Sequence, residues 1–138
     1  MNFRILFTGF LLVLLASPAF ADQTLLLRQP ALSQDHLAFV YAGDIWVSEW
    51  SGQNARRLTS GPATEDTPVF SPDGSMIAFR AGYENNNDVY VMPVAGGQPQ
   101  RLTWHPGRDT PQGWSKDGKE VFFVSARETD HGRSGQLY

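Results

Sequence analysis

Charged side chains gather in two short segments of this chain, and they are the first candidates for a binding site. Glu65 and Asp66 lie in one segment, and Arg108 and Asp109 lie in the other. Such a set could line a passage for a ligand, or it could lie at a solvated rim. The choice between the two depends on the fold that positions the segments.

The histidines do not suggest a metal centre. His36, His105 and His131 are scattered along the chain, and no two of them have the i, i+4 spacing that builds a zinc site on a helix. Their sequence contexts favour surface loops.

Residues 85–88, Asn-Asn-Asn-Asp, place several side-chain oxygens close together, which is a pattern that a hard cation such as calcium could use. The segment lacks the alternating ligands, the internal glycine and the bidentate glutamate of the known calcium loop. Asn and Asp are also common in turns. A turn is therefore favoured over a metal site.

No nucleophile is suggested either. Ser71 and Ser115 lie in Ser-x-Asp-Gly segments typical of tight turns, and no Gly-x-Ser-x-Gly motif is present. The chain has no cysteine, and Gly96-Gly97 does not lie between a strand and a helix as a phosphate loop would. We predict no catalytic residue, no metal site and no cofactor site in these residues.

The strongest pattern is an internal repeat of 44 residues. Three pairs of short sequence motifs are separated by 44 residues. They are 44–47 and 88–91 (Asp-Ile-Trp-Val and Asp-Val-Tyr-Val), 57–59 and 101–103 (Arg-Leu-Thr), and 71–74 and 115–118 (Ser-Pro-Asp-Gly and Ser-Lys-Asp-Gly). A period of this length with four strands per unit is typical of a β-propeller. The sequence thus predicts an all-β fold of four-stranded blades.

The period divides the chain into about two and a half blades. Blade 1 is expected over about 30–59, blade 2 over about 68–103, and the start of blade 3 over about 110–138. In the best-patterned unit, strands are expected at 68–71, 76–80, 89–94 and 99–103, and a short extra strand over 24–28 could pair with a blade elsewhere in the ring.

A propeller binds ligands at its central axis, which the innermost strands and adjoining loops line. The loops that enter these strands are expected over 60–67 and 104–110. Glu65, Asp66, Arg108 and Asp109 are therefore candidates to face the channel, and a solvated rim is the equal alternative.

Six large aromatic residues recur within the repeat, and we expect them to fill the space between blades rather than to form a ligand platform. They are Trp46, Phe70, Phe79, Tyr90, Trp114 and Phe123.

Residues 1–21 have the layout of a cleavable secretory signal peptide. Arg4 precedes an apolar run from Ile5 to Leu15, and residues 19–21 form a small-x-small cleavage site. The run is shorter than the roughly 20 residues that span a bilayer, so we expect export and no membrane segment after cleavage. Removal of Arg4 leaves 10 basic residues against 14 acidic ones, which argues against nucleic acid as a partner.

Propellers have roughly four to eight blades, so the sequence is expected to be the front of a longer protein. Residues 136–138 have the pattern of a strand that has just begun.

The repeat words resemble a known group of propellers. Leu-Thr at a blade end, followed by Pro-x-(Phe/Trp)-Ser-x-Asp-Gly, resembles the repeats of TolB, of prolyl-oligopeptidase-type enzymes and of tricorn proteases. Residues 26–30, 43–46, 55–59, 105–109 and 113–115 are similar to the opening of bacterial tricorn-type proteases. This second resemblance covers essentially all of residues 23–138.

The resemblance implies a six-bladed N-terminal propeller, a second propeller, a PDZ-like domain and a C-terminal serine peptidase domain. The propellers of that family filter and pass peptides, and none of its catalytic motifs lies here, so no catalytic residue is carried over. Archaeal tricorn is cytosolic, whereas this chain has an export signal, so a periplasmic location is expected. The partners implied are peptides or proteins at the channel, and oligomerisation stays open. The alternative is a non-enzymatic, TolB-like periplasmic propeller that binds proteins.

Overall fold

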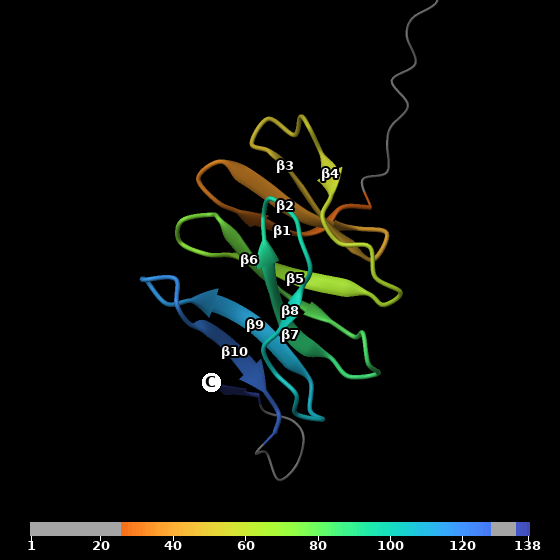
Figure 1. Cartoon of the computed structure of the whole chain (residues 1–138), viewed down its shortest axis with the longest axis vertical. Coiled ribbons are helices and arrows are strands. Elements are labelled where there is room, and N and C mark those ends of the chain that lie inside the picture. Colours follow the sequence, from red (N-terminus) through yellow and green to blue (C-terminus); the bar gives the residue numbers. More distant parts are fainter. Residues whose placement is uncertain (1–25, 128–134) are drawn as a thin grey trace, which may run out of the picture.

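The computed structural model describes residues 26–127 and 135–138, and the regular elements within them are all β-strands (Figure 1). The first sheet contains β1 (Arg28–Leu32), β2 (His36–Tyr41), β3 (Asp44–Glu49) and β4 (Arg56–Arg57). The second contains β5 (Glu65–Phe70), β6 (Met76–Ala81), β7 (Asp88–Pro93) and β8 (Gln100–Arg101). The third contains β9 (Asp109–Trp114), β10 (Val121–Ser125) and β11 (Gln136–Leu137).

The three sheets are consecutive blades of a propeller. Every strand pairs antiparallel with the next one in its own sheet. The first strands, β1, β5 and β9, contact one another in turn, and the sheets fan out from them (Figure 1). The predicted all-β, partial-propeller fold is confirmed.

The first strand of each blade has an irregular register near a proline. The pairing shifts at Gln29-Pro30 in β1 and at Thr67-Pro68 in β5. Gln29 and Thr67 have positive φ values of 51° and 53°, and a proline cannot donate to the ladder. In β9 the extra residue is Gln112, which lies between the partners of Phe122 and Phe123.

The first strands also begin earlier than the sequence suggested. The backbone N–H of Glu65 donates to the carbonyl of Gly43, and that of Asp109 donates to the carbonyl of Asn87. Within their own blades, Glu65 and Asp66 pair with β6, and Asp109 pairs with β10, so β5 and β9 begin before their prolines. Glu65, Asp66 and Asp109 therefore lie in strands rather than in the predicted loops.

Some predicted features fall outside the described residues. These are the leader over 1–21, the first part of the strand expected over 24–28, His131 and most of the polar loop over 127–135. In the described part of the extra strand, Leu26 and Leu27 are not in a strand, and Arg28 begins β1. No helix among the residues with described structure is long and apolar enough to cross a membrane.

The core lies between the first and second blades. Ile45 and Val47 of the first blade pack with Ile77, Phe79 and Met92 of the second, and all five are almost fully buried. Each blade also stacks one pair of aromatic rings, with centroids 5.6–6.5 Å apart: Phe39–Trp46, Phe79–Tyr90 and Phe123–Tyr138.

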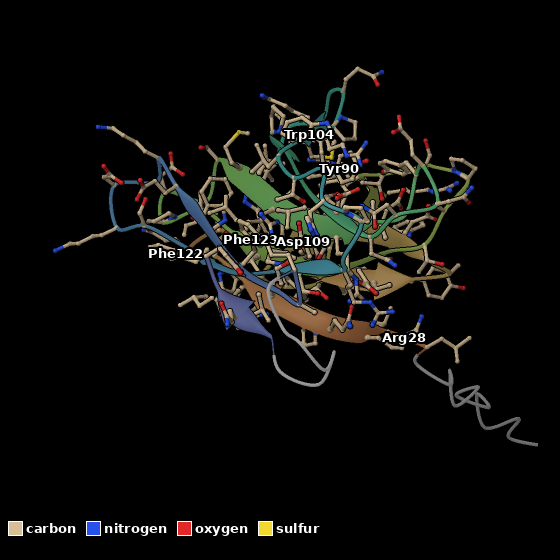
Figure 2. The ribbon with its side chains drawn as sticks, turned by 90° about the horizontal axis from the view of Figure 1, so that it is seen from below. Arg28, Tyr90, Trp104, Asp109, Phe122 and Phe123 are labelled. Atoms are coloured by element: carbon tan, nitrogen blue, oxygen red, sulfur yellow. The ribbon has the colours of Figure 1, made fainter. Side chains whose placement is uncertain are left out.

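The burial of the six predicted inter-blade aromatic residues depends on the blade to which they belong. Phe70, Phe79 and Tyr90 of the middle blade are buried. The three on the flanking blades are half-buried, because each flanking blade has a described neighbour on one side: Trp46, Trp114 and Phe123. Asp109 lies among the sheets, while Trp104 lies at the periphery (Figure 2).

The Ser-x-Asp-Gly segments form the turns that the sequence predicted. Gly74 and Gly118 have φ values of 70° and 71°, the left-handed region that glycine adopts without strain. The Ser71 hydroxyl donates to Asp73 at 2.6 Å, and Ser75 donates to the same carboxylate. These bonds, that of Ser71 above all, lower the pKa of Asp73 to about 2.

We expect Ser71→Ala to raise the pKa of Asp73 toward its ordinary value of 3.8, as measured by an NMR pH titration of the carboxyl group. Because the pKa is depressed in the folded state, the carboxylate stabilises the fold above about pH 4. That contribution is lost as the pH falls through about 2. The control is Asp117, whose own lowered pKa depends chiefly on Ser115 and should not move. An unchanged Asp73 titration would contradict the assignment.

Candidate functional site

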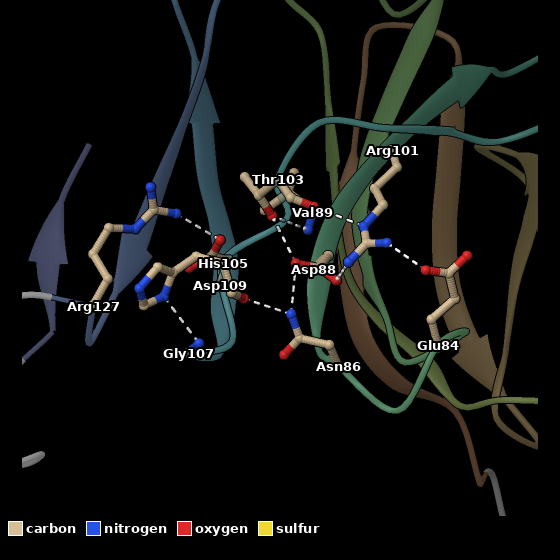
Figure 3. Close-up of polar contacts among 10 residues, drawn as sticks. All are labelled: Glu84, Asn86, Asp88, Val89, Arg101, Thr103, His105, Gly107, Asp109 and Arg127. Carbon is tan, nitrogen blue, oxygen red and sulfur yellow. Dashed lines mark hydrogen bonds and ion pairs between the residues drawn. The ribbon is translucent and has the colours of Figure 1, made fainter.

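A buried polar cluster joins the third strand, the outermost strand and the following link of blade 2 (Figure 3). The Asp88 side chain is fully buried and accepts from the Arg101 guanidinium at 2.6 Å. The Thr103 hydroxyl lies 3.3 Å from Asp88 and accepts from the Val89 N–H at 3.0 Å. Arg101 also donates to the Thr103 carbonyl and to Glu84.

The same cluster recurs in blade 1. Arg57 donates to Asp44 at 2.8 Å, the Thr59 hydroxyl accepts from the Ile45 N–H at 2.9 Å, and Arg57 Nε donates to the Thr59 carbonyl. The Arg57 side chain is 47% exposed, compared with 18% for Arg101. In blades 1 and 2, the repeated Asp, Arg and Thr residues thus connect the third strand to the outermost strand and to the link that follows it.

We expect Asp88→Ala to cost about 2 kcal/mol of unfolding free energy, because it leaves a largely buried guanidinium with Glu84 as its remaining acidic partner. The matched control is Asp44→Ala, which should cost about 1 kcal/mol or less, since Arg57 can be hydrated. Urea unfolding of the two variants measures the difference. Equal costs would show that burial of the cluster is unimportant.

We call residues 58–65 the first joint and residues 102–109 the second joint, because each links the outermost strand of one blade to the first strand of the next. Glu65 ends the first joint and is fully buried. It accepts from the Thr59 hydroxyl at 2.6 Å, the Gly61 N–H at 3.2 Å and the Tyr83 hydroxyl at 2.6 Å. Burial and the bond to Glu65 raise the pKa of Tyr83.

Asp109 ends the second joint and takes the place of Glu65. It is fully buried and accepts from Arg127, the repeat equivalent of Tyr83, at 2.7 Å. The Arg127 guanidinium also lies over the rings of Phe123 and Tyr138, 5.0 and 4.8 Å from their centroids. A Glu–Tyr pair at one joint is thus replaced by an Asp–Arg pair at the next.

The shorter carboxylate has a structural consequence. Glu65 reaches the Thr59 hydroxyl, whereas the Asp109 Oδ1 atom is buried without a hydrogen-bond partner among the described residues. The equivalent hydroxyl, that of Thr103, instead lies near Asp88.

The four charged residues that the sequence suggested as candidates differ in their burial. Glu65 and Asp109 are buried in the joints, and Arg108 is exposed in the loop before β9. Asp66 is partly buried and pairs with Arg80 at 2.5 Å. Whether any of them faces a channel stays a prediction, since the described residues do not close a ring.

Arg80 is a residue that the sequence analysis missed. It donates to Asp66 on β5 and to the Thr110 hydroxyl on β9, at 3.2 Å, so it bridges the first strands of two blades. A charged residue that ends an otherwise apolar strand was the available signal.

The other candidates have structural roles. Asn86 donates to Asp88 and to the His105 carbonyl, and His105 Nδ1 accepts from the Gly107 N–H at 3.0 Å (Figure 3). The His36 ring stacks on Phe70. Within residues 26–127 and 135–138, no group of three or more His, Cys, Asp or Glu side chains could hold a metal ion. Chemically, these groups hold blades and loops in place.

Comparison with known proteins adds a family to this architecture. Residues 24–138 match the family model described as the tricorn protease N-terminal beta propeller domain. Tricorn protease homolog 2 of Streptomyces coelicolor is 44% identical over 54 residues, which are 38% of this chain and 5% of that protein. The chain therefore spans a small part of this relative.

Solved structures show the same fold. A crystal structure of the tricorn protease superposes with a TM-score of 0.72 at 24% identity, covering 82% of this chain and 12% of that chain. TolB from Acinetobacter baumannii superposes with a TM-score of 0.67 at 28% identity, covering 81% of this chain and 29% of that chain.

Proposed function

Because this chain belongs to the tricorn protease N-terminal β-propeller family, we propose that it is the front of the propeller of an exported tricorn-type serine peptidase. In this proposal the propeller admits and orients peptides, and peptide bonds are cleaved by a separate domain. The observation that carries the proposal is the family match over residues 24–138.

Exposed apolar side chains on the two flanking blades support the proposal that these blades belong to a larger ring. Leu32 on the first blade is 57% exposed, and Phe122 and Leu137 on the third are 40% and 66% exposed. Apolar side chains of this size are normally covered in a propeller, because each blade packs against two neighbours. Further blades of the same chain are the proposed cover.

The polar groups support a role other than catalysis. The Ser71 and Ser115 hydroxyls are bonded to Asp73 and Asp117 in their own turns. The buried carboxylate of Glu65 accepts from the Thr59 hydroxyl, and that of Asp109 accepts from the Arg127 guanidinium. Asp66 and Arg108 are the remaining candidates for contact with peptides in a channel.

Export is part of the proposal. Arg4, the apolar run from Ile5 to Leu15 and the small residues at 19 and 21 support a cleavable leader and a periplasmic location. A non-enzymatic, protein-binding propeller is the second candidate, and the likeness to TolB at 28% identity favours it.

Sequencing the gene beyond codon 138 distinguishes the two candidates. We expect the reading frame to continue through further blades into a PDZ-like region and a peptidase domain. A frame that closes after a few more blades would refute the peptidase and favour the binding propeller.

Two assays complete the test. The product of the whole frame should hydrolyse peptides, and the purified segment 22–138 should not. After fractionation of the native host, the protein should be periplasmic and should lack residues 1–21. Peptide hydrolysis by the segment alone would contradict the proposal that the propeller admits peptides and a separate domain cleaves them.

A further inference from the structure

The Asp109 carboxylate at the second joint has one oxygen atom with a partner and one without. Its Oδ2 atom accepts from the Arg127 guanidinium at 2.7 Å, whereas the buried Oδ1 atom has no hydrogen-bond partner among the described residues. Asp109 lies among the sheets and is fully buried, so bulk solvent does not reach it (Figure 2). Buried polar atoms in native proteins nearly always bond to another protein group or to an ordered water molecule.

The first joint shows how the repeat satisfies such a carboxylate. The Thr59 hydroxyl donates to Glu65 at 2.6 Å, and the Gly61 N–H donates to the same carboxylate at 3.2 Å. The 44-residue repeat places Thr103 and His105 at the corresponding positions of the second joint. The Thr103 hydroxyl and the His105 N–H are therefore the donors that the repeat directs toward Asp109.

The Thr103 hydroxyl lacks a close acceptor for its proton. It accepts from the Val89 N–H at 3.0 Å, and it lies 3.3 Å from the Asp88 carboxylate, longer than the 2.5–3.0 Å that is usual between two such oxygen atoms. Aspartate is shorter than glutamate by one C–C bond, about 1.5 Å. The Asp109 carboxylate therefore does not reach this hydroxyl as Glu65 reaches the hydroxyl of Thr59.

The charges around the second joint favour a neutral ligand (Figure 3). Each of its buried carboxylates already has a guanidinium as counter-ion, Arg127 for Asp109 at 2.7 Å and Arg101 for Asp88 at 2.6 Å. A carboxylate can only accept hydrogen bonds, whereas the Thr103 hydroxyl has a proton to donate. The molecule that joins them must donate to one and accept from the other, and it must be small enough to stand in for one methylene group. Water meets these requirements.

We propose that the second joint binds one buried water molecule, which donates to the Oδ1 atom of Asp109 and accepts from the Thr103 hydroxyl. Buried waters typically make about three hydrogen bonds, and the His105 N–H is the third partner, at the position of the Gly61 N–H in the first joint. The second joint is thus held through a water where the first joint is held by direct contact. This inference does not rest on the proposed function, because it concerns the contact between two blades alone.

The test is a high-resolution crystal structure of the chain and of two reciprocal variants. In the parent we expect one ordered water within hydrogen-bond distance of Asp109 Oδ1 and of the Thr103 hydroxyl. Asp109→Glu should put a carboxylate oxygen in its place and lose the water. Glu65→Asp should gain an equivalent water beside Thr59. The matched control is Asp117→Glu in an exposed turn, which should keep the water of the second joint.

Magnetic relaxation dispersion of solvent water counts long-lived internal waters in solution, and Asp109→Glu should lose one of those in the parent. If this variant does not fold, the double variant Asp109→Glu/Arg127→Tyr, which recreates the pair of the first joint, takes its place. A protein donor bonded to Oδ1 in the parent, or no density between Asp109 and Thr103, would overturn the proposal. A peak with six or more oxygen ligands at about 2.3–2.6 Å would overturn it as well, because it would identify a cation.

Discussion

Replacing Arg127 with leucine is expected to destabilise the protein by about 3–5 kcal/mol, because it leaves the Asp109 carboxylate buried without its counter-ion. The carboxylate cannot turn to solvent, since Asp109 is fully buried. With a slope of about 2 kcal/mol per molar urea, the unfolding midpoint should fall by roughly 2 M. Urea unfolding followed by circular dichroism measures this shift.

The matched control is Arg108→Leu, one residue before Asp109. Arg108 is exposed, and surface substitutions usually change stability by less than about 0.5 kcal/mol. If the two variants unfold at the same urea concentration, the buried pair contributes nothing and the assignment of Arg127 is wrong.

A double variant tests the interpretation of the repeat itself. Arg127→Tyr alone leaves a phenol too far from the short carboxylate, and Asp109→Glu alone crowds the guanidinium. Together they recreate the Glu65–Tyr83 pair of the first joint, so we expect the double variant to recover most of the stability lost by the singles. Additive losses would show that the two joints are not equivalent.

The blades could be predicted from the sequence because identical or similar short motifs recur at one spacing. The Asp, Arg and Thr positions at 44, 57 and 59 return at 88, 101 and 103, and the structure builds the same cluster from both sets. The cluster itself was not predicted, although its three members were visible in the repeat. A repeated sequence motif shows which positions of two blades are equivalent, but it does not show which of their side chains are in contact.

The joints were harder to predict, because equivalent positions carry different residue types. Glu65 and Tyr83 become Asp109 and Arg127, so no shared word marks them. Their charge suggested exposure, but both residues pair within the sheet of their own blade, and their N–H groups bond to Gly43 and Asn87 of the preceding blade. Burial of a charged residue depends on partners that come from distant parts of the sequence.

Replacing Glu65 with leucine should lower the free energy of unfolding by about 3–5 kcal/mol, as much as the replacement of Arg127 with leucine. The carboxylate satisfies three donors at once, the Thr59 hydroxyl, the Gly61 N–H and the Tyr83 hydroxyl. Each buried donor that loses its acceptor costs about 1–3 kcal/mol, and part of this is recovered where Gly61 and Tyr83 reach water. Urea unfolding gives the cost, and the exposed Glu120 offers Glu120→Leu as a control with little effect.

The variant Glu65→Gln distinguishes the contribution of the hydrogen bonds of Glu65 to stability from that of its side-chain shape. An amide of the same size keeps one acceptor oxygen but directs an NH₂ group at the remaining donors, so the cost should fall between those of the parent and of Glu65→Leu. If Glu65→Leu is instead as stable as the parent, apolar packing alone holds blades 1 and 2 together, and the polar joint is dispensable. The expected order, parent above Glu65→Gln above Glu65→Leu, would show that the donors of the first joint require this carboxylate.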